Sequence, residues 1–242
     1  MTTYRIDEAQ RTAAKVVGAA YLLAMATAVF AELYIPSRLL VTGDVAGTAR
    51  NIAAHQQLFR FGIVADLVTF AADLILIAAL YVVLSPVSKG LALLATLWRL
   101  IETSTMVAAT VNNLEVLRLL KGGGYLGAFD TTHLQALARL SIHTHGAGYN
   151  VGMLFFGLGS TLFCALWYRS QYMPRALAAL GVFGSLSVAA WVLAYIAAPA
   201  VADAVDLFAF MPIFIFEVTT GFWLLLKGLP RRATTALAGA PA

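Results

Sequence analysis

Six runs of about 20 apolar residues dominate this sequence, and a soluble fold has no place for them. A transmembrane helix needs about 20 consecutive apolar residues to cross a bilayer core. Apolar residues make up 61% and charged residues 12% of the 242-residue chain, whereas soluble domains carry about 45–50% and about 25%. We therefore expect an all-α fold: an integral membrane bundle of six transmembrane helices that forms a single transmembrane domain over residues 1–242, with spans at 12–31, 58–84, 91–113, 146–167, 176–197 and 207–226.

Turn and cap residues predict where these helices begin and end. The Ile35-Pro36 step disfavours continued helix, so we expect the first span to close before it. Asp44 is a good N-cap and precedes a short helix at 45–57, whose apolar residues share one face. This pattern is typical of an interfacial helix lying on the membrane between the first and second spans. Pro199 is expected to stop the fifth span, and an acidic loop follows it.

Basic residues are scattered along the chain rather than clustered. The net charge is +4, and nucleic-acid binding would need a clustered basic face, so nucleic acid is excluded as a partner. Cys164 is the one cysteine and cannot form an internal disulfide. The positive-inside rule favours cytoplasmic N- and C-termini in the cell membrane, because nine basic residues lie on that side and six on the other: Arg5, Arg11, Lys15, Lys89, Arg169, Arg175, Lys227, Arg231 and Arg232, against Arg38, Arg50, Arg60, Arg118, Lys121 and Arg139.

A series of short motifs covers nearly the whole chain in a particular order. They are Thr48-Ala49-Arg50-Asn51-Ile52, Leu58-Phe59-Arg60-Phe61-Gly62 with Asp66-Leu67, Arg99-Leu100-Ile101-Glu102, Leu154-Phe155-Phe156-Gly157-Leu158, and Arg169-Ser170 followed by Pro174-Arg175-Ala176-Leu177. In order and spacing the chain resembles an uncharacterised bacterial membrane family, domain of unknown function 4386. The resemblance implies a multi-pass helical membrane protein, and it implies no activity or functional residues.

Several ionisable residues lie inside the apolar runs. A charge at bilayer depth costs about 3 kcal/mol, so such charges normally pair with one another. Arg99 and Glu102 are spaced i,i+3 and can pair within one helix. The apolar runs also contain Asp66, Asp73 and Glu217, and one arginine cannot neutralise all four carboxylates. Either some carboxyls carry protons or a cation or basic ligand binds. We expect an outward-facing polar cavity with an ion-paired floor, formed from Arg99, Glu102, Asp66, Asp73, Glu217, Asn113, Asn150 and Tyr149.

Histidines near the third and fourth spans raise a metal-binding alternative. His143 and His145 are two residues apart and diverge by about 200° on a helix, so a regular helix cannot aim both at one ion. With His55 and an acidic partner, Asp66 or Glu32, they could still supply the ligands of a zinc site.

Three functions follow from these patterns, and one of them is a helper subunit of another membrane complex. The first is a non-enzymatic protein, without a cofactor, that binds a small ligand, a lipid or a cation in the cavity. The alternative is a membrane-embedded, zinc-dependent hydrolase that acts on a lipid, so enzymatic activity stays open. Membrane lipids are the expected partners, and self-association stays open as well.

Overall fold

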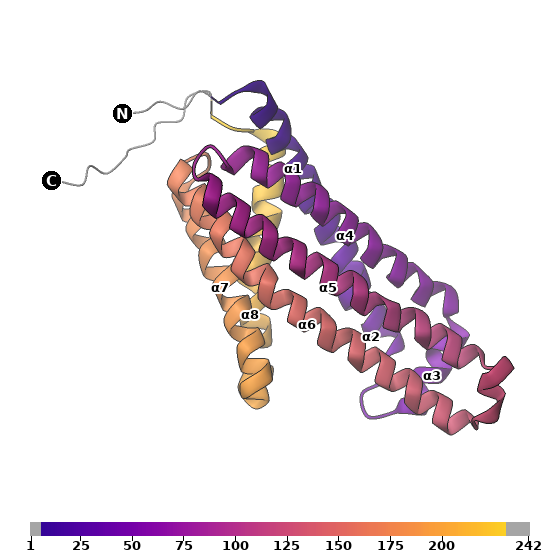
Figure 1. The fold of residues 1–242 in the computed structure, drawn as a ribbon. Coiled ribbons are helices and arrows are strands. Elements are labelled where there is room, and N and C mark those ends of the chain that lie inside the picture. The colour runs from indigo at the N-terminus through magenta and orange to yellow at the C-terminus, as the bar shows by residue number, and fades with distance from the viewer. Residues whose placement is uncertain (1–5, 231–242) are drawn as a thin grey trace. The chain divides into compact units, whose positions relative to one another are not determined.

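The computed structural model describes residues 6–230, and the backbone over this range is almost entirely helical (Figure 1). No β-strand occurs among these described residues, so the expected all-α fold is confirmed. Arg5, Arg231 and Arg232, which were counted for the orientation, lie outside them. The elements are α1 (Glu8–Ala28), η1 (Val29–Tyr34), α2 (Ile35–Leu39), α3 (Val45–Ala54), α4 (Gln56–Leu84), α5 (Lys89–Lys121), η2 (Gly124–Ala128), α6 (Thr131–Ser170), α7 (Arg175–Ala197) and α8 (Pro199–Leu226).

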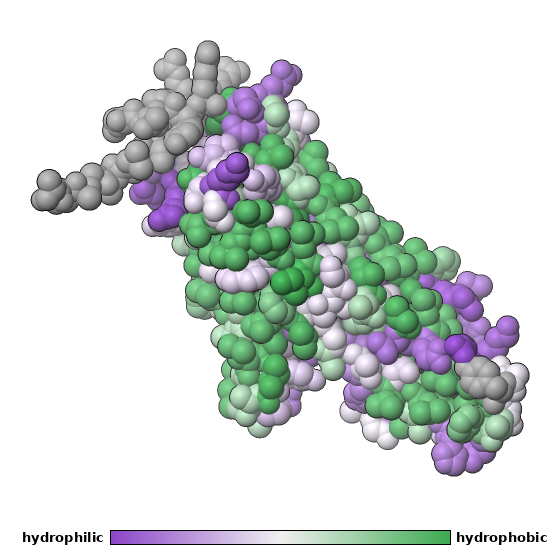
Figure 2. Space-filling view, in the orientation of Figure 1, coloured by the Kyte–Doolittle hydropathy of each residue, from purple (hydrophilic) through white to green (hydrophobic). Residues whose placement is uncertain are grey.

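Long apolar helices make this chain a multi-pass membrane protein. Within the described residues, five helical segments are long and apolar enough to cross a bilayer: Glu8–Leu39, α4, α5, α6 and α7. The predicted sixth span is helical, as α8, but is not among those five, so the count of six is not confirmed. Figure 2 shows hydrophobic side chains over much of the helical surface on the face drawn. Large apolar side chains exposed in this way suit contact with lipid tails.

The expected end of the first span is wrong. The chain stays helical past Glu32 and Pro36, through the π-helical turn η1 and into α2, and ends only at Leu39. Pro36 lies in the first turn of α2, where a missing backbone N–H costs little. The short α3 does begin after Asp44, whose carboxylate accepts a hydrogen bond of 2.7 Å from the Gly47 N–H. It ends at Ala54, three residues earlier than expected, and its place at the membrane interface stays a prediction.

The expected end of the fifth span is confirmed, because α7 ends at Ala197 before Pro199, but the acidic loop expected after it is wrong. Pro199 opens α8, and Asp203 and Asp206 lie inside that helix rather than in a loop. Proline is favoured at the first helical position because its fixed φ suits the helix and its missing N–H has no partner there anyway. Only Ala198, with φ −148° and ψ 68°, separates α7 from α8.

The chain divides into two compact units. Unit 1 comprises Met1–Leu23, Ala72–Glu102 and Met153–Ala242, and unit 2 comprises Ala24–Ala71 and Thr103–Gly152. Helices α1, α4, α5 and α6 contribute segments to both, whereas α7 and α8 lie wholly in unit 1.

Small residues let helices α7 and α8 approach closely within unit 1. A Cβ added to Gly184 would lie 2.5 Å from the backbone nitrogen of Ile213, and one added to Gly181 would lie 2.7 Å from the ring of Phe216. Small residues play this role in membrane helix packing, because lipid supplies no hydrophobic force between helices. Unit 2 instead has a core of larger side chains, which includes Leu39, Ile52 and Val116.

Candidate functional site

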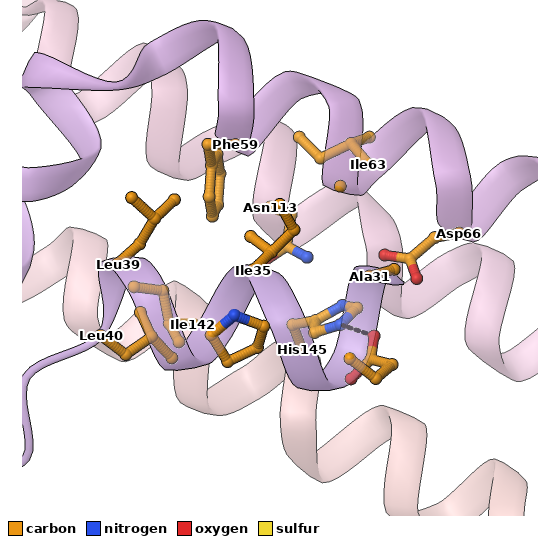
Figure 3. A pocket seen from close by; sticks show the side chains of 13 residues that line it. Ala31, Ile35, Leu39, Leu40, Phe59, Ile63, Asp66, Asn113, Ile142 and His145 are labelled. Atoms are coloured by element: carbon orange, nitrogen blue, oxygen red, sulfur yellow. Dashed lines mark hydrogen bonds and ion pairs between the residues drawn. The ribbon is translucent and has the colours of Figure 1, made fainter. Parts of the chain in front are cut away.

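Unit 2 contains a small pocket with mainly apolar walls and a polar group of side chains on one side. Its volume is about 60 Å³. Ile35, Leu39, Phe59, Ile63 and Ile142 are among the apolar walls (Figure 3). The polar side chains of the lining are Glu32, Asp66, Asn113 and His145.

Three separate helical segments supply the ionisable members of this group. Glu32 lies on the π-helical turn η1, Asp66 on α4 and His145 on α6. π-helix accounts for well under 1% of residues in proteins, and single π turns are frequent at functional sites. The wider turn therefore places a carboxylate in a position that an uninterrupted α-helix would not give it.

The three side chains converge on one point. Nε2 of His145 lies 3.4 Å from Oε1 of Glu32, and one donor atom from each of Glu32, Asp66 and His145 lies within 4.8 Å of the others. Figure 3 shows Asp66 and His145 directed towards the same space. Asp66 and His145 are buried. The Ala109 carbonyl lies near the His145 ring, yet Nδ1 makes no hydrogen bond of normal geometry.

Four other residues expected at this site do not line the pocket. His143 and His55 are exposed and do not join the Glu32–Asp66–His145 cluster. Because α6 runs as one unbroken helix, His143 points away from His145 as the two-residue spacing requires. The Tyr149 ring lies against the His145 ring, with 6.2 Å between centroids, and Asn150 is half-buried; neither lines the pocket.

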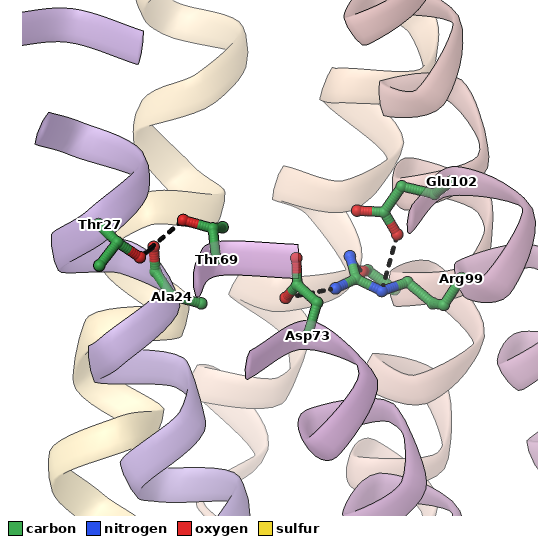
Figure 4. A network of polar contacts seen from close by, with 7 residues as sticks. Ala24, Thr27, Thr69, Asp73, Arg99 and Glu102 are labelled. Atoms are coloured by element: carbon green, nitrogen blue, oxygen red, sulfur yellow. Dashed lines mark hydrogen bonds and ion pairs between the residues drawn. The ribbon is translucent and has the colours of Figure 1, made fainter. Parts of the chain in front are cut away.

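A separate polar network in unit 1 surrounds Arg99. Nη2 of Arg99 lies 3.2 Å from the Asp73 carboxylate, and Nε lies 3.0 Å from that of Glu102 (Figure 4). Nη1 donates to the Ser160 hydroxyl at 3.3 Å. The Phe156 ring stacks on the guanidinium, 4.5 Å from centroid to Cζ. Arg99 and Glu102 are each only 2% exposed.

This polar network joins helices α4, α5 and α6, and none of its residues lines the pocket. Gly159 makes room for the arginine stem, because a Cβ there would lie 2.7 Å from Cγ of Arg99. Glu217 on α8 forms no ion pair within 4 Å among the described residues. Arg99, Glu102, Asp73 and Glu217 are all absent from the pocket lining, so the expected ion-paired floor is not part of this pocket.

Sequence reasoning did not find every member of these two groups. Glu32 was expected at the end of the first span, and only the π turn brings it into the pocket. Phe156 and Ser160 were not anticipated as partners of Arg99. Their one sequence signal is the small residue Gly159 between them in the chain, which permits close approach of α5 and α6.

Long apolar helices with ionisable side chains buried between them define a helical, multi-pass membrane protein. The chain belongs to the family described as domain of unknown function DUF4386, whose model matches residues 16–228. A relative from Archaeoglobus fulgidus, named "Uncharacterized protein", is 29% identical over 174 residues, which cover 69% of this chain and 84% of the relative. Similar chains therefore occur outside bacteria. No solved structure matches this chain.

Proposed function

We propose that the unit 2 pocket binds one divalent transition-metal cation, with zinc as the best fit, through Glu32, Asp66 and His145. The observation that carries this proposal is the convergence of an imidazole and two carboxylates, from three helical segments, within 4.8 Å. Two carboxylates at such a distance in a buried pocket repel each other unless a proton or a cation lies between them. A divalent ion neutralises both at once.

The spacing of the His145–Glu32 donor pair suits a metal. Zinc lies about 2.0–2.2 Å from nitrogen and oxygen ligands in a tetrahedral array, so neighbouring ligand atoms are about 3.4 Å apart. The 3.4 Å between His145 Nε2 and Glu32 Oε1 matches that edge. It is long for a hydrogen bond between nitrogen and oxygen, which is normally about 2.7–3.2 Å.

The surroundings of His145 support the same assignment. A metal-bound histidine usually donates its second ring N–H to a carbonyl or carboxylate, which fixes the ring orientation. The Ala109 carbonyl lies near this ring, and Nδ1 makes no hydrogen bond of normal geometry. A metal on Nε2 would leave Nδ1–H free to donate to that carbonyl.

The size of the pocket and the types of its donor atoms limit which ions or molecules it can bind. A water molecule needs about 10–15 Å³ of such space, so about 60 Å³ accommodates an ion with a few waters and no acyl chain. Calcium prefers six to eight oxygen ligands, and magnesium prefers oxygen ligands and keeps several waters. An imidazole beside carboxylates favours zinc or another first-row transition metal.

A metal-dependent hydrolase is the second candidate. Three protein donors leave the fourth tetrahedral position for a water, as in catalytic zinc sites. The small volume of the pocket argues against a lipid substrate, and we rank this function below cation binding for that reason.

Metal titration of the purified protein tests the proposal. Protein from which any affinity tag has been cleaved is stripped with a chelator, and Zn²⁺, Mn²⁺, Ca²⁺ and Mg²⁺ are then titrated separately by calorimetry. We expect about one equivalent of Zn²⁺ and weaker Ca²⁺ and Mg²⁺ binding. Zinc at 100 times its Kd should stabilise the fold by about 2.7 kcal/mol.

His143 supplies the matched control. The His145→Ala variant should lose the zinc equivalent and the added stability, and His143→Ala should keep both, because only His145 belongs to the cluster. Equal loss in the two variants, or Ca²⁺ binding as tightly as Zn²⁺, would contradict the proposal.

A further inference from the structure

A second hollow lies in unit 1, between the turn that joins α6 to α7 and the C-terminal end of α8. Gln171–Pro174 line one side, and Trp223, Lys227, Gly228 and Pro230 line the other. Its volume is about 360 Å³, which is within the usual range for small-molecule sites. We call it the Lys227 groove, and we propose that it binds the headgroup of an anionic phospholipid.

The walls of the Lys227 groove are held by backbone geometry and caps. Gln171 has φ 56°, a conformation that non-glycine residues rarely adopt, and the Ser170 hydroxyl beside it accepts a hydrogen bond of 3.3 Å from the Tyr172 N–H. Gly228, at φ 63°, ends α8 by donating its N–H to the Trp223 carbonyl at 3.3 Å. These contacts shape the groove before any ligand arrives, which lowers the entropic cost of binding.

The Lys227 groove carries a positive charge on an exposed side chain. Lys227 is the only charged residue among the described residues that line it. Its ammonium group lies 4.2 Å from the centroid of the Trp223 ring and is exposed. Arg175 lies beside the same turn, over the Tyr168 ring. No aspartate or glutamate occurs at positions 167–176 or 218–230, so the two segments that form the groove carry no carboxylate of their own.

Helical spacing places exposed apolar side chains, which could contact lipid acyl chains, next to this charge. Trp223 and the C-cap residue Lys227 are spaced i,i+4 at the end of α8 and lie on one stripe, while Phe222 and Leu226 form the neighbouring stripe. Phe222 is 53% and Leu226 81% exposed. A phosphate at Lys227 would therefore have exposed apolar side chains beside it, as a phospholipid requires and a free phosphate does not. Tryptophan and lysine are also the residues that favour the headgroup level of a membrane.

Lipid retention in nanodiscs tests the proposal. Wild-type protein is reconstituted in phosphatidylcholine containing a minor fraction of phosphatidylglycerol, and the lipids that remain bound after release are counted by native mass spectrometry. We expect selective retention of phosphatidylglycerol. One lysine near a membrane surface contributes about 1 kcal/mol, so Lys227→Gln should weaken retention about five-fold.

Lys89→Gln is the matched control, because Lys89 is an exposed lysine of unit 1 outside the groove. It should retain phosphatidylglycerol as the wild type does. Phosphatidylglycerol should also change tryptophan emission in the wild type and not in Trp223→Phe. Equal retention by the two lysine variants, equal retention of phosphatidylcholine, or displacement of the lipid by inorganic phosphate would each overturn the proposal.

Discussion

Replacement of Arg99 is the sharpest test of what stabilises unit 1. The side chain is 2% exposed and lies between the Asp73 and Glu102 carboxylates at 3.2 and 3.0 Å. Arg99→Met retains much of the apolar stem and removes the cation, so both carboxylates remain buried without a partner. Breaking a buried ion pair from one side costs about 3–5 kcal/mol. Loss of the stacking on Phe156 adds up to about 2 kcal/mol, and because these terms overlap we expect a loss of about 4 kcal/mol.

Reversible unfolding in mixed detergent micelles measures this loss against the wild type. A triple variant, Arg99→Met with Asp73→Asn and Glu102→Gln, separates charge from packing. It removes the unpaired carboxylates together with the cation, and replacing all members of a buried ionic group is often nearly neutral. The triple variant should therefore recover most of the loss. Stabilisation by the Arg99 ion pairs would be refuted by either of two results. One is an Arg99→Met variant within about 1 kcal/mol of the wild type in stability, and the other is a triple variant no more stable than Arg99→Met.

Three further variants test local features of the fold. Gly184→Ala should destabilise unit 1 by about 1–3 kcal/mol, because its Cβ would lie 2.5 Å from the Ile213 nitrogen, and Gly90→Ala, with nothing within 4 Å, is the control in the same melting assay. Asp44→Ala removes the N-cap of α3 and should cost about 1 kcal/mol in the unfolding free energy; no change would refute the cap. The His133 backbone N–H holds the pKa of the Asp130 carboxyl below its usual range, so this contribution to stability is present at neutral pH and is lost as the pH falls below about 4. An acid titration followed by circular dichroism should show this loss in the wild type and not in Asp130→Asn, and identical titrations would contradict it.

Two prolines show how well local sequence rules predict where helices end. Pro36 and Pro199 were both expected to end helices. α7 does end at Ala197, before Pro199, whereas the helix that contains Pro36 continues through the π turn to Leu39. The local rule is the same in either case, since proline is disfavoured inside a helix and tolerated at its start. Whether a helix ends before a proline or continues through it depends on the residues packed around that segment.

Local patterns in the sequence are enough to specify the class of this protein. Apolar runs of membrane-spanning length, and the order of short motifs, specify an all-α membrane protein of the DUF4386 family. This information is local, because hydrophobicity and helical periodicity are read from neighbouring residues. The i,i+3 spacing of Arg99 and Glu102 is equally local, and the structure places the two groups 3.0 Å apart.

Which polar residues of different helices meet depends on how those helices pack. Asp66 and Asp73 lie seven residues apart on one stripe of α4, so the sequence treats them as equivalent partners for Arg99. In the structure Asp73 meets Arg99 in unit 1, whereas Asp66 joins Glu32 and His145 in the unit 2 pocket. The physical reason is that a partner from another helix is selected by packing and by the register of that helix. A single π turn at Val29–Tyr34 is enough to change which residue faces the pocket.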